Sequence, residues 1–306
     1  MKLTDNISQA ISGTAIISAL VITLPQPVQA LTGEEINDIA RNITVLIRSE
    51  KGHGSGFIIS KSNNTYYVLT ANHVVGSQDD YRIVTHDKEI YTIDYSKVKK
   101  LPDSDLSVVE FTSDRTYQTA KLADSSTATQ GSSVFVSGWP RLTTVGNAAG
   151  GELIRQFTNG QISGFLPKSI DGYQMIYTNT TLAGMSGGPV LDTGGRVIGI
   201  HGLGDTEDQQ RLVSEGMSEE VAGRVASLIK PGFNYAIPMN KFLDVVGQER
   251  IYISLDVETT PPDALGAAYV PSEETDPRDR VELKDVLGDI NNTVDTIRNV
   301  CGFFRC

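Results

Sequence analysis

Residues 184–190 read Gly-Met-Ser-Gly-Gly-Pro-Val, and this stretch places a serine between glycines. Glycine adopts turns that are closed to other residues, and it leaves backbone N–H groups free to point at a developing oxyanion. We therefore expect the hydroxyl of Ser186 to be exposed in a tight turn. A serine hydroxyl is a poor nucleophile until a base takes its proton, so a base is sought elsewhere in the chain.

A candidate base and a candidate carboxylate precede this serine. His73 lies in the stretch LTANHVV, and Asp105 lies in the stretch DSDLSVV. The order His, Asp, Ser is that of one known triad arrangement. Asp103 competes with Asp105, which is preferred because an apolar run follows it directly and places it at the end of a strand. Viewed singly, these residues are also consistent with a turn hydroxyl, a buried histidine and a strand cap. Their joint order favours nucleophilic catalysis.

Short β-type runs dominate the rest of the chain. They are rich in Val, Ile, Thr and Tyr and are bounded by Gly, Pro, Asn, Asp or Ser, which is typical of strands. The runs are Ile43–Arg48, Gly56–Ser60, Tyr66–Thr70, Arg82–Thr85, Ile90–Tyr95, Ser107–Phe111, Ser133–Ser137, Glu152–Asn159, Gln174–Asn179, Pro189–Leu191, Val197–His201 and Asn234–Ile237. The stretch DTGG at 192–195 predicts a hairpin connection. The pattern predicts an all-β sandwich or barrel rather than alternating helices and strands.

A few helices interrupt this pattern. Residues 34–41 predict a short helix with Thr32 as its N-cap and Glu35 completing a capping box. Residues 239–248 predict a second short helix that closes the β unit. Residues 205–230 are acidic and then helical in composition, which indicates an inserted surface loop and helix.

The N-terminal 30 residues are typical of an export signal. Lys2 gives a positive start, residues 15–24 form a short apolar run, and Val28-Gln29-Ala30 ends in small residues suited to cleavage. A retained membrane anchor is the alternative interpretation. Removal of this signal predicts a secreted or periplasmic protein.

The C-terminal part follows the β unit of residues 31–255 and has two segments. Residues 256–280 have the Pro-rich, acidic composition of a linker. Residues 281–306 predict an amphipathic helix, whose apolar residues follow one helical stripe. The stripe residues are Leu283, Leu287, Ile290, Val294 and Ile297. Self-association through this helix and docking on the chain's own barrel are both open.

Charge and cysteine usage narrow the function classes. The chain of 306 residues has a net charge of −11, and removal of the signal takes away one lysine and one aspartate, so that charge is unchanged. Such a surface repels nucleic acid. Cys301 and Cys306 could form a local disulfide, stay as free thiols or pair with a second chain. The cysteines and histidines show no ligand spacing, so no metal or cofactor is expected.

At this point the chain resembles the chymotrypsin-like, trypsin-fold serine peptidases, especially bacterial members without a PDZ module. The resemblance rests on motifs across residues 33–255. They are Gly54-Ser55-Gly56-Phe57-Ile58, Thr70-Ala71-Asn72-His73, Asp105-Leu106-Ser107, Gly184-Met185-Ser186-Gly187-Gly188-Pro189 and Phe233-Asn234-Tyr235-Ala236-Ile237-Pro238. The resemblance implies two packed six-stranded antiparallel β-barrels, with short helices and the C-terminal helical appendage.

The resemblance also implies roles for individual residues. Ser186 would be the nucleophile, His73 the general base and Asp105 the residue that orients the imidazole. The N–H groups of Gly184 and Ser186 would form the oxyanion hole. The expected function is that of an exported serine endopeptidase that acts on proteins or peptides through an acyl-enzyme.

Two positions depart from the digestive trypsin-like enzymes. Met185 stands where those enzymes carry the aspartate that pairs with a new N-terminus, so activation by that ion pair is excluded. Thr180 stands where tryptic enzymes place an acid, which disfavours cleavage after Lys or Arg. Thr181 and His201 instead match the glutamyl endopeptidase subgroup and predict a preference for Glu at P1, although His201 could simply fill the wall beneath the cleft.

Two other function classes compete with the peptidase. One is a catalytically silent binding protein with a protease fold, because Met185 could accompany a distorted oxyanion hole. The other is a chaperone-protease of the high-temperature-requirement type. That class is disfavoured because too few residues follow the expected barrels to form a PDZ domain.

Overall fold

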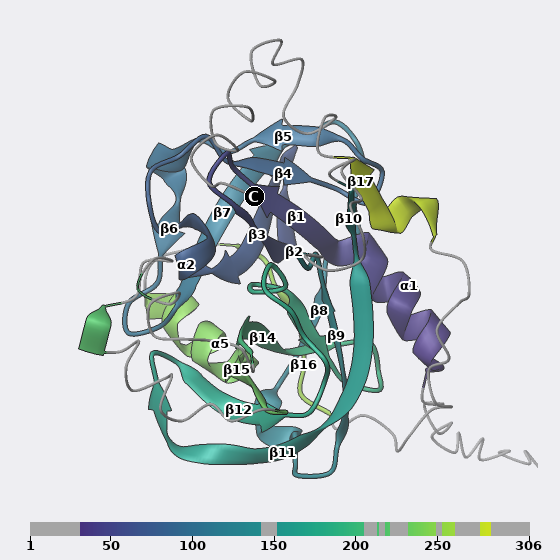
Figure 1. Cartoon of the computed structure of the whole chain (residues 1–306), viewed down its shortest axis with the longest axis vertical. Coiled ribbons are helices and arrows are strands. Elements are labelled where there is room, and N and C mark those ends of the chain that lie inside the picture. Colours follow the sequence, from purple (N-terminus) through teal and green to yellow (C-terminus); the bar gives the residue numbers. More distant parts are fainter. Residues whose placement is uncertain are drawn as a thin grey trace, which may run out of the picture.

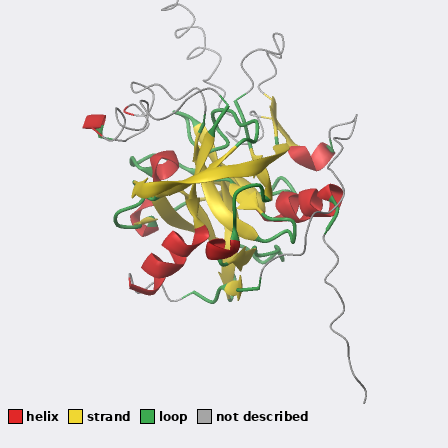
Figure 2. Ribbon diagram, turned by 90° about the horizontal axis from the view of Figure 1, so that it is seen from below, coloured by secondary structure: helices red, strands yellow, loops and turns green. Residues whose placement is uncertain are grey.

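Most of the described chain is β-structure arranged in two sheets. The computed structural model describes residues 31–141, 152–204, 213, 218–220, 232–248, 253–260 and 276–282. Figure 1 shows the N-terminal half, coloured purple to blue, above a second half that is mostly teal to green. The helices lie around the strands at the periphery (Figure 2).

The first sheet is a curled half-barrel. Its seven strands are ordered β5-β4-β1-β2-β3-β7-β6. Their bounds are β1 (Thr44–Arg48), β2 (His53–Ser62), β3 (Thr65–Ala71), β4 (Arg82–Val84), β5 (Ile90–Thr92), β6 (Lys99–Lys100) and β7 (Leu106–Thr112). Val45, Ile58 and Val68 lie in the apolar cluster of this half.

The second sheet contains a closed barrel. The order is β13-β9-β11-β12-β15-β14-β8-β16, and an additional pairing of β13 with β14 closes a ring of six strands. The bounds are β8 (Lys121–Ala123), β9 (Ser133–Gly138), β11 (Gln156–Ile170), β12 (Tyr173–Tyr177), β13 (Pro189–Leu191), β14 (Val197–Leu203), β15 (Asn234–Pro238) and β16 (Asp256–Glu258). The two sheets confirm the predicted all-β class and are consistent with the expected double barrel.

A shared apolar core joins the two halves. Phe57 and Leu69 of the first sheet belong to the same cluster of buried side chains as Leu191 and Ile200 of the second. Burial of apolar surface is the dominant favourable contribution to folding, so this cluster holds the halves against one another. The functional residues described below come from both halves, and this packing sets their relative positions.

The predicted helices and hairpin are confirmed where the structure describes them. Helix α1 (Gly33–Ile43) has Thr32 as its N-cap, and Glu35 completes the capping box. Helix α5 (Met239–Gln248) follows β15, and β13 pairs antiparallel with β14 across the predicted turn at 192–195. The other helical segments are α2 (Asn72–Val75) and the 3₁₀ turns η1 (Tyr95–Lys97), η2 (Ser125–Thr127) and η3 (Pro277–Asp279).

The segment expected to be a linker contains ordered structure at both ends. β16 pairs with β8, and η3 leads into β17 (Arg280–Glu282), which pairs antiparallel with β10 (Glu152–Ile154). Figure 1 shows β10 and β17 beside the start of β1 and near α1. Asp279 of η3 receives hydrogen bonds from the buried guanidinium groups of Arg41 and Arg155. This ionic contact fixes residues 276–282 on the body of the protein.

Several predicted segments lie outside the described residues. These are the export signal at 1–30, most of the insertion at 205–230, the apolar stripe from Leu283 onward, and Cys301 and Cys306. Within the described part of the chain, no helix is long and apolar enough to span a membrane.

Candidate active site

The antiparallel register of β3 and β7 brings His73 and Asp105 together. Ala71 at the end of β3 pairs with Leu106 at the start of β7, so the residues just beyond this pair are adjacent. Asp105 Oδ2 lies 2.5 Å from His73 Nδ1, and Asp105 Oδ1 accepts the backbone N–H of His73 at 2.8 Å. One carboxylate therefore orients the imidazole through Nδ1 and also holds the backbone of His73. Asp103 is exposed in the preceding turn, and the structure therefore brings Asp105 to the histidine.

Tyr173 of β12 makes a further contact with this carboxylate, which the sequence did not predict. Its hydroxyl donates to Asp105 Oδ2 at 2.6 Å. Burial raises the pKa of Tyr173 well above its usual value, and the charge of Asp105 raises it further, so the hydroxyl stays a donor. A side chain on Gly202 would overlap this ring, because its Cβ would lie 1.8 Å from the hydroxyl oxygen. Tyr173 belongs to the second half of the molecule, and its contact therefore links Asp105 to the opposite barrel.

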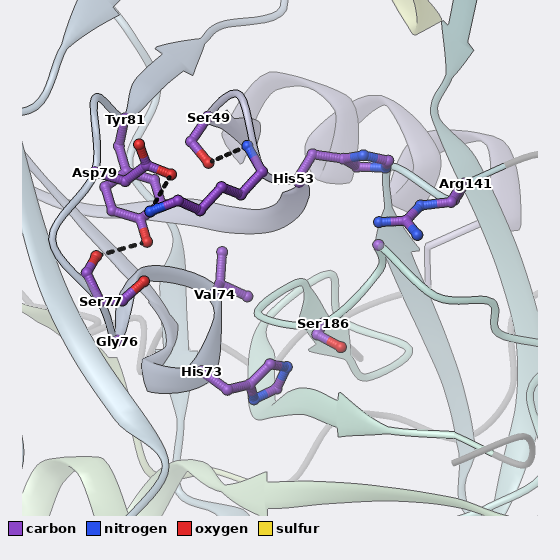
Figure 3. A pocket seen from close by; sticks show the side chains of 13 residues that line it. Ser49, His53, His73, Val74, Gly76, Ser77, Asp79, Tyr81, Arg141 and Ser186 are labelled. Atoms are coloured by element: carbon purple, nitrogen blue, oxygen red, sulfur yellow. Dashed lines mark hydrogen bonds and ion pairs between the residues drawn. The ribbon is translucent and has the colours of Figure 1, made fainter. Parts of the chain in front are cut away.

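Ser186 lies in the loop before β13 and is only 7% exposed, so the expectation of an exposed hydroxyl is wrong: the side chain is buried. Its hydroxyl donates to the carbonyl of Gly202 at 2.9 Å. Ser186 and His73 line the same pocket, which has a volume of about 230 Å³. Figure 3 shows both side chains at one edge of this pocket. The structure thus places Asp105 against His73, and it places His73 and Ser186 on the lining of one pocket.

The predicted oxyanion-hole residues form a tight turn. Met185 N–H donates to Leu182 O at 3.1 Å, and Gly184 has a φ of +97°. This is the pattern of a type II turn, whose third residue needs a positive φ. The carbonyl of Ala183 accepts the N–H of Arg141 at 2.6 Å. Because the C=O and N–H of a trans peptide point in opposite directions, this contact aims the N–H of Gly184 away from Arg141.

Ser55 of β2 anchors this turn to the first half-barrel. Its backbone N–H donates to Ser186 O at 2.8 Å, and its hydroxyl donates to Gly184 O at 2.9 Å. The same hydroxyl oxygen accepts the N–H of Trp139 at 2.8 Å. The backbone and the hydroxyl of Ser55 therefore both hold the turn against the first sheet. The sequence marked Ser55 only as part of a glycine-rich motif.

Met185 is an apolar anchor for the turn. It is 1% exposed and lies in the apolar cluster of the second barrel, together with Val136, Tyr177 and Val190. Met185, which cannot form the activating ion pair of the digestive enzymes, is thus held in place by apolar packing.

The predicted P1 residues lie apart from the pocket that contains Ser186 and His73. His201 of β14 is 2% exposed, and its Nδ1 lies 2.5 Å from the hydroxyl of Tyr177. Thr181 is partly buried, and its hydroxyl donates to Asn234 Oδ1. Neither of these two residues lines the pocket.

The pocket also contains charged residues that the sequence did not single out. Lys51, Asp79 and Arg141 line it together with His53. His53 Nε2 lies 3.1 Å from Trp139 O, and a carbonyl only accepts, so this nitrogen carries the proton. Burial and the nearby charges of Arg141 and Arg48 lower the pKa of His53 to about 4, so its ring is neutral at pH 7. Among the described residues, no group of His, Cys, Asp or Glu could hold a metal ion.

Similarity to known proteins agrees with this geometry. Residues 54–200 match the family of trypsin-like peptidase domains, a range that includes His73, Asp105 and Ser186. The serine protease Do-like HtrA of Bacillus subtilis (strain 168) is 28% identical over 232 residues, which cover 70% of this chain and 45% of that protein. A protein of the same description from Lactobacillus helveticus is 30% identical over 189 residues, which cover 58% of this chain and 43% of that protein. The chain thus spans less than half the length of either relative.

A solved structure shows the same kind of fold. The crystal structure of Rv3671c from M. tuberculosis H37Rv, in its inactive form, superposes with a TM-score of 0.50 at 18% identity. The match covers 74% of this chain and 96% of that chain. The match to the trypsin-like peptidase domain and the similarity to HtrA-type serine proteases, together with the two sheets, support a serine peptidase of chymotrypsin fold.

Proposed function

We propose that this protein is a serine endopeptidase that cleaves proteins or peptides through an acyl-enzyme. The observation that carries the proposal is the hydrogen bond between His73 Nδ1 and Asp105, because His73 and Ser186 line the same pocket. An imidazole fixed at Nδ1 by a carboxylate presents Nε2 as the base for a serine hydroxyl. The family match over residues 54–200 supports the same assignment.

The mechanism follows from these contacts. The hydroxyl of Ser186 turns from the carbonyl of Gly202 to His73, which takes its proton as Oγ attacks the substrate carbonyl carbon. The N–H groups of Gly184 and Ser186 stabilise the oxyanion, each contributing about 3 kcal/mol to the transition state. His73 then gives its proton to the leaving amine as the C–N bond breaks. Water, activated by the same imidazole, hydrolyses the ester and restores Ser186.

A fluorophosphonate probe tests this assignment. The probe modifies an activated serine, so we expect labelling of the wild-type protein and none of Ser186→Ala. Ser126→Ala serves as the control, because this exposed serine lies on η2 outside the pocket and its loss should leave labelling intact. A wild-type protein that is folded but unlabelled would instead support the silent binding protein.

The preference for Glu at P1 is a second part of the proposal. Thr181 and His201 supply a hydroxyl and an imidazole, which can donate hydrogen bonds to a carboxylate. Because Tyr177 occupies Nδ1 of His201, a substrate carboxylate would have to use Nε2. A panel of peptides that differ only at P1 tests this preference. Equal cleavage after Glu, Ala and Leu would refute it.

Export is the third part, and it rests on the composition of residues 1–30. Mass spectrometry of the protein recovered from the medium or the periplasm should find an N-terminus after Ala30. Recovery of the chain with residues 1–30 intact in the membrane fraction would support the retained anchor instead.

A further inference from the structure

The pocket beside Ser186 lies on the leaving-group side of the proposed reaction. His73 and Val74 line it, whereas the predicted P1 residues Thr181 and His201 do not. In the proposed mechanism His73 delivers its proton to the leaving amine, so that amine must lie on the side of the imidazole. The chain that follows the amine then enters this pocket.

Positive charge faces this pocket. Lys51 and Arg141 are its lining cations, and Asp79 is its lining carboxylate. Asp79 already contacts Lys51, at 3.7 Å, and accepts the backbone N–H of Asp80 at 2.9 Å. No carboxylate among the described residues forms an ion pair with Arg141. Figure 3 shows the guanidinium group of Arg141 extending toward the pocket, beside His53.

A second arginine, Arg48, lies beside His53 and close enough to Arg141 to interact with its charge. Arg48 of β1 pairs in register with His53 of β2, and its Nε is buried without a hydrogen-bond partner in the described structure. Burial lowers the pKa of Arg48, and the charge of Arg141 lowers it further. The two guanidinium groups therefore repel one another. An anion bound in the pocket beside Arg141 would relieve this repulsion and would accept charge-assisted hydrogen bonds.

We propose that this pocket binds a carboxylate carried by the leaving-group part of the substrate, within the first two residues after the scissile bond. The inference rests on the proposed peptidase function and extends it to a second specificity site. The chain has a net charge of −11, so an acidic substrate would be repelled by most of its surface. Lys51, Arg48 and Arg141 offset that repulsion beside Ser186.

Matched peptide pairs test the proposal. Each pair has one acyl half and carries either Glu or Gln at the first or second leaving-group position. We expect kcat/KM to be about tenfold higher for Glu, which is the size of one hydrogen bond to a charged group. A further pair whose leaving dipeptide ends in a free acid or an amide shows whether a terminal carboxylate also occupies the pocket. The Glu preference should fall as salt is added, because Arg141 is exposed.

Variants assign the preference to the pocket. In Arg141→Gln the Glu-to-Gln ratio should fall toward one, whereas Arg141→Lys should keep part of it. Lys51→Gln should also lower the Glu-to-Gln ratio. This second variant is needed because a change at Arg141 could disturb the turn that accepts the backbone N–H of Arg141. Lys97→Gln is the control, because it removes one positive charge from an exposed pair with Glu110 outside the pocket. That variant should keep the wild-type ratio.

The outcomes separate this inference from the proposed function. A folded wild-type protein that cleaves none of the peptides and takes up no fluorophosphonate overturns the peptidase function and this inference with it. Cleavage of every peptide with ratios near one overturns the carboxylate site alone. A wild-type preference that survives in both Arg141→Gln and Lys51→Gln also overturns it. A preference seen only with the free C-terminal acid supports the site and identifies its ligand as a terminal carboxylate.

Discussion

Both the backbone conformation and the close packing at position 184 require glycine. Its φ of +97° is unfavourable for any residue with a Cβ, and a Cβ there would lie 2.6 Å from both His53 Nε2 and Trp139 O. Gly184→Ala should therefore move the turn that holds the oxyanion N–H groups. We expect kcat to fall by about 100-fold or more, which is the usual result of losing one oxyanion donor. Steady-state kinetics on a peptide substrate measure this loss.

Gly131 provides the matched control. Its φ of +84° imposes the same backbone strain, but a Cβ there would meet nothing within 4 Å. Gly131→Ala should cost about 1 kcal/mol of stability and leave kcat unchanged. Equal falls in kcat in Gly184→Ala and Gly131→Ala would show that the loss of activity does not depend on the position of Gly184 in the turn.

His53 makes the stability of the protein depend on pH. Its pKa in the folded protein is about 4, compared with 6.5 in an unfolded chain, because burial and two arginines disfavour its charged form. The unfolded state therefore binds more protons between these values. The stabilisation is fully present above pH 6.5 and is lost as pH falls toward 4. Between pH 7.5 and 5 we expect the wild-type free energy of unfolding to decrease by about 2 kcal/mol through this group.

Urea unfolding of His53→Gln checks this prediction. Glutamine can still donate to Trp139 O but does not titrate, so the loss between the two pH values should shrink by the contribution of His53. His86 also has a pKa lowered by burial and is present in both proteins, so its contribution cancels in the comparison. An identical pH dependence in both proteins would contradict the assignment to His53.

At the scale of elements, residues 276–282 are held by a buried ionic cluster. Asp279 accepts from Arg41 Nε at 2.9 Å and from Arg155 Nε at 2.6 Å. Asp279→Asn removes a carboxylate that two buried guanidinium groups share, which should destabilise the protein by about 3 kcal/mol. Thermal or urea unfolding measures the loss.

Asp276→Asn is the comparison for this cluster. Asp276 pairs with Arg278 at 2.7 Å, and the Arg278 side chain is half exposed. Asp276 also contacts the buried Arg41, but only at 3.8 Å, so its replacement should cost about 1 kcal/mol. Similar losses in both variants would mean that burial of the cluster is unimportant.

The helices and strands differ in how far each could be predicted from the sequence. The capping box of Thr32 and Glu35 is local, and α1 could be predicted from it. Each of the twelve β-type runs contains residues of an observed strand. The strands β6, β8, β16 and β17 could not be predicted, because each has only two or three residues. β8, β16 and β17 also depend on partners far away in the chain. The pairing of β8 with β16 is the extreme case, since Leu122 pairs with Val257, which lies more than a hundred residues later.

The candidate site divides in the same way. His73, Asp105 and Ser186 could be predicted because short motifs surround each of them. Tyr173 could not, since its contact with Asp105 depends on how the two halves pack. Arg141 and Lys51 could not either, because nothing in their local sequence differs from an ordinary surface cation.

At the scale of the whole molecule, Ser55 joins the two halves beneath the proposed nucleophile. Ser55→Ala removes the hydrogen bond to Gly184 O and leaves the buried N–H of Trp139 without its acceptor. We expect a loss of about 1–3 kcal/mol in stability and at least a tenfold fall in kcat, because the oxyanion turn loses a support. Unfolding and kinetic measurements on one preparation give both values.

Ser60→Ala isolates the kinetic part. Ser60 lies on the same strand, and its replacement also removes a partly buried hydrogen bond, which Ser60 donates to Ser254 O at 2.5 Å. Its variant should lose stability without losing kcat. A tenfold kinetic loss there as well would show that the effect of Ser55→Ala reflects general weakening of β2.

The contacts of Ser55 with Ser186 and Gly184 also mean that neither half contains the whole candidate site. A polypeptide divided between β7 and β8 would separate His73 and Asp105 from the serine and from the backbone that shapes its turn. Such fragments should be inert alone and should hydrolyse substrate again once fused partners hold them together. The architecture thus makes this chain suitable for a split reporter, in which proteolysis records the meeting of two other proteins.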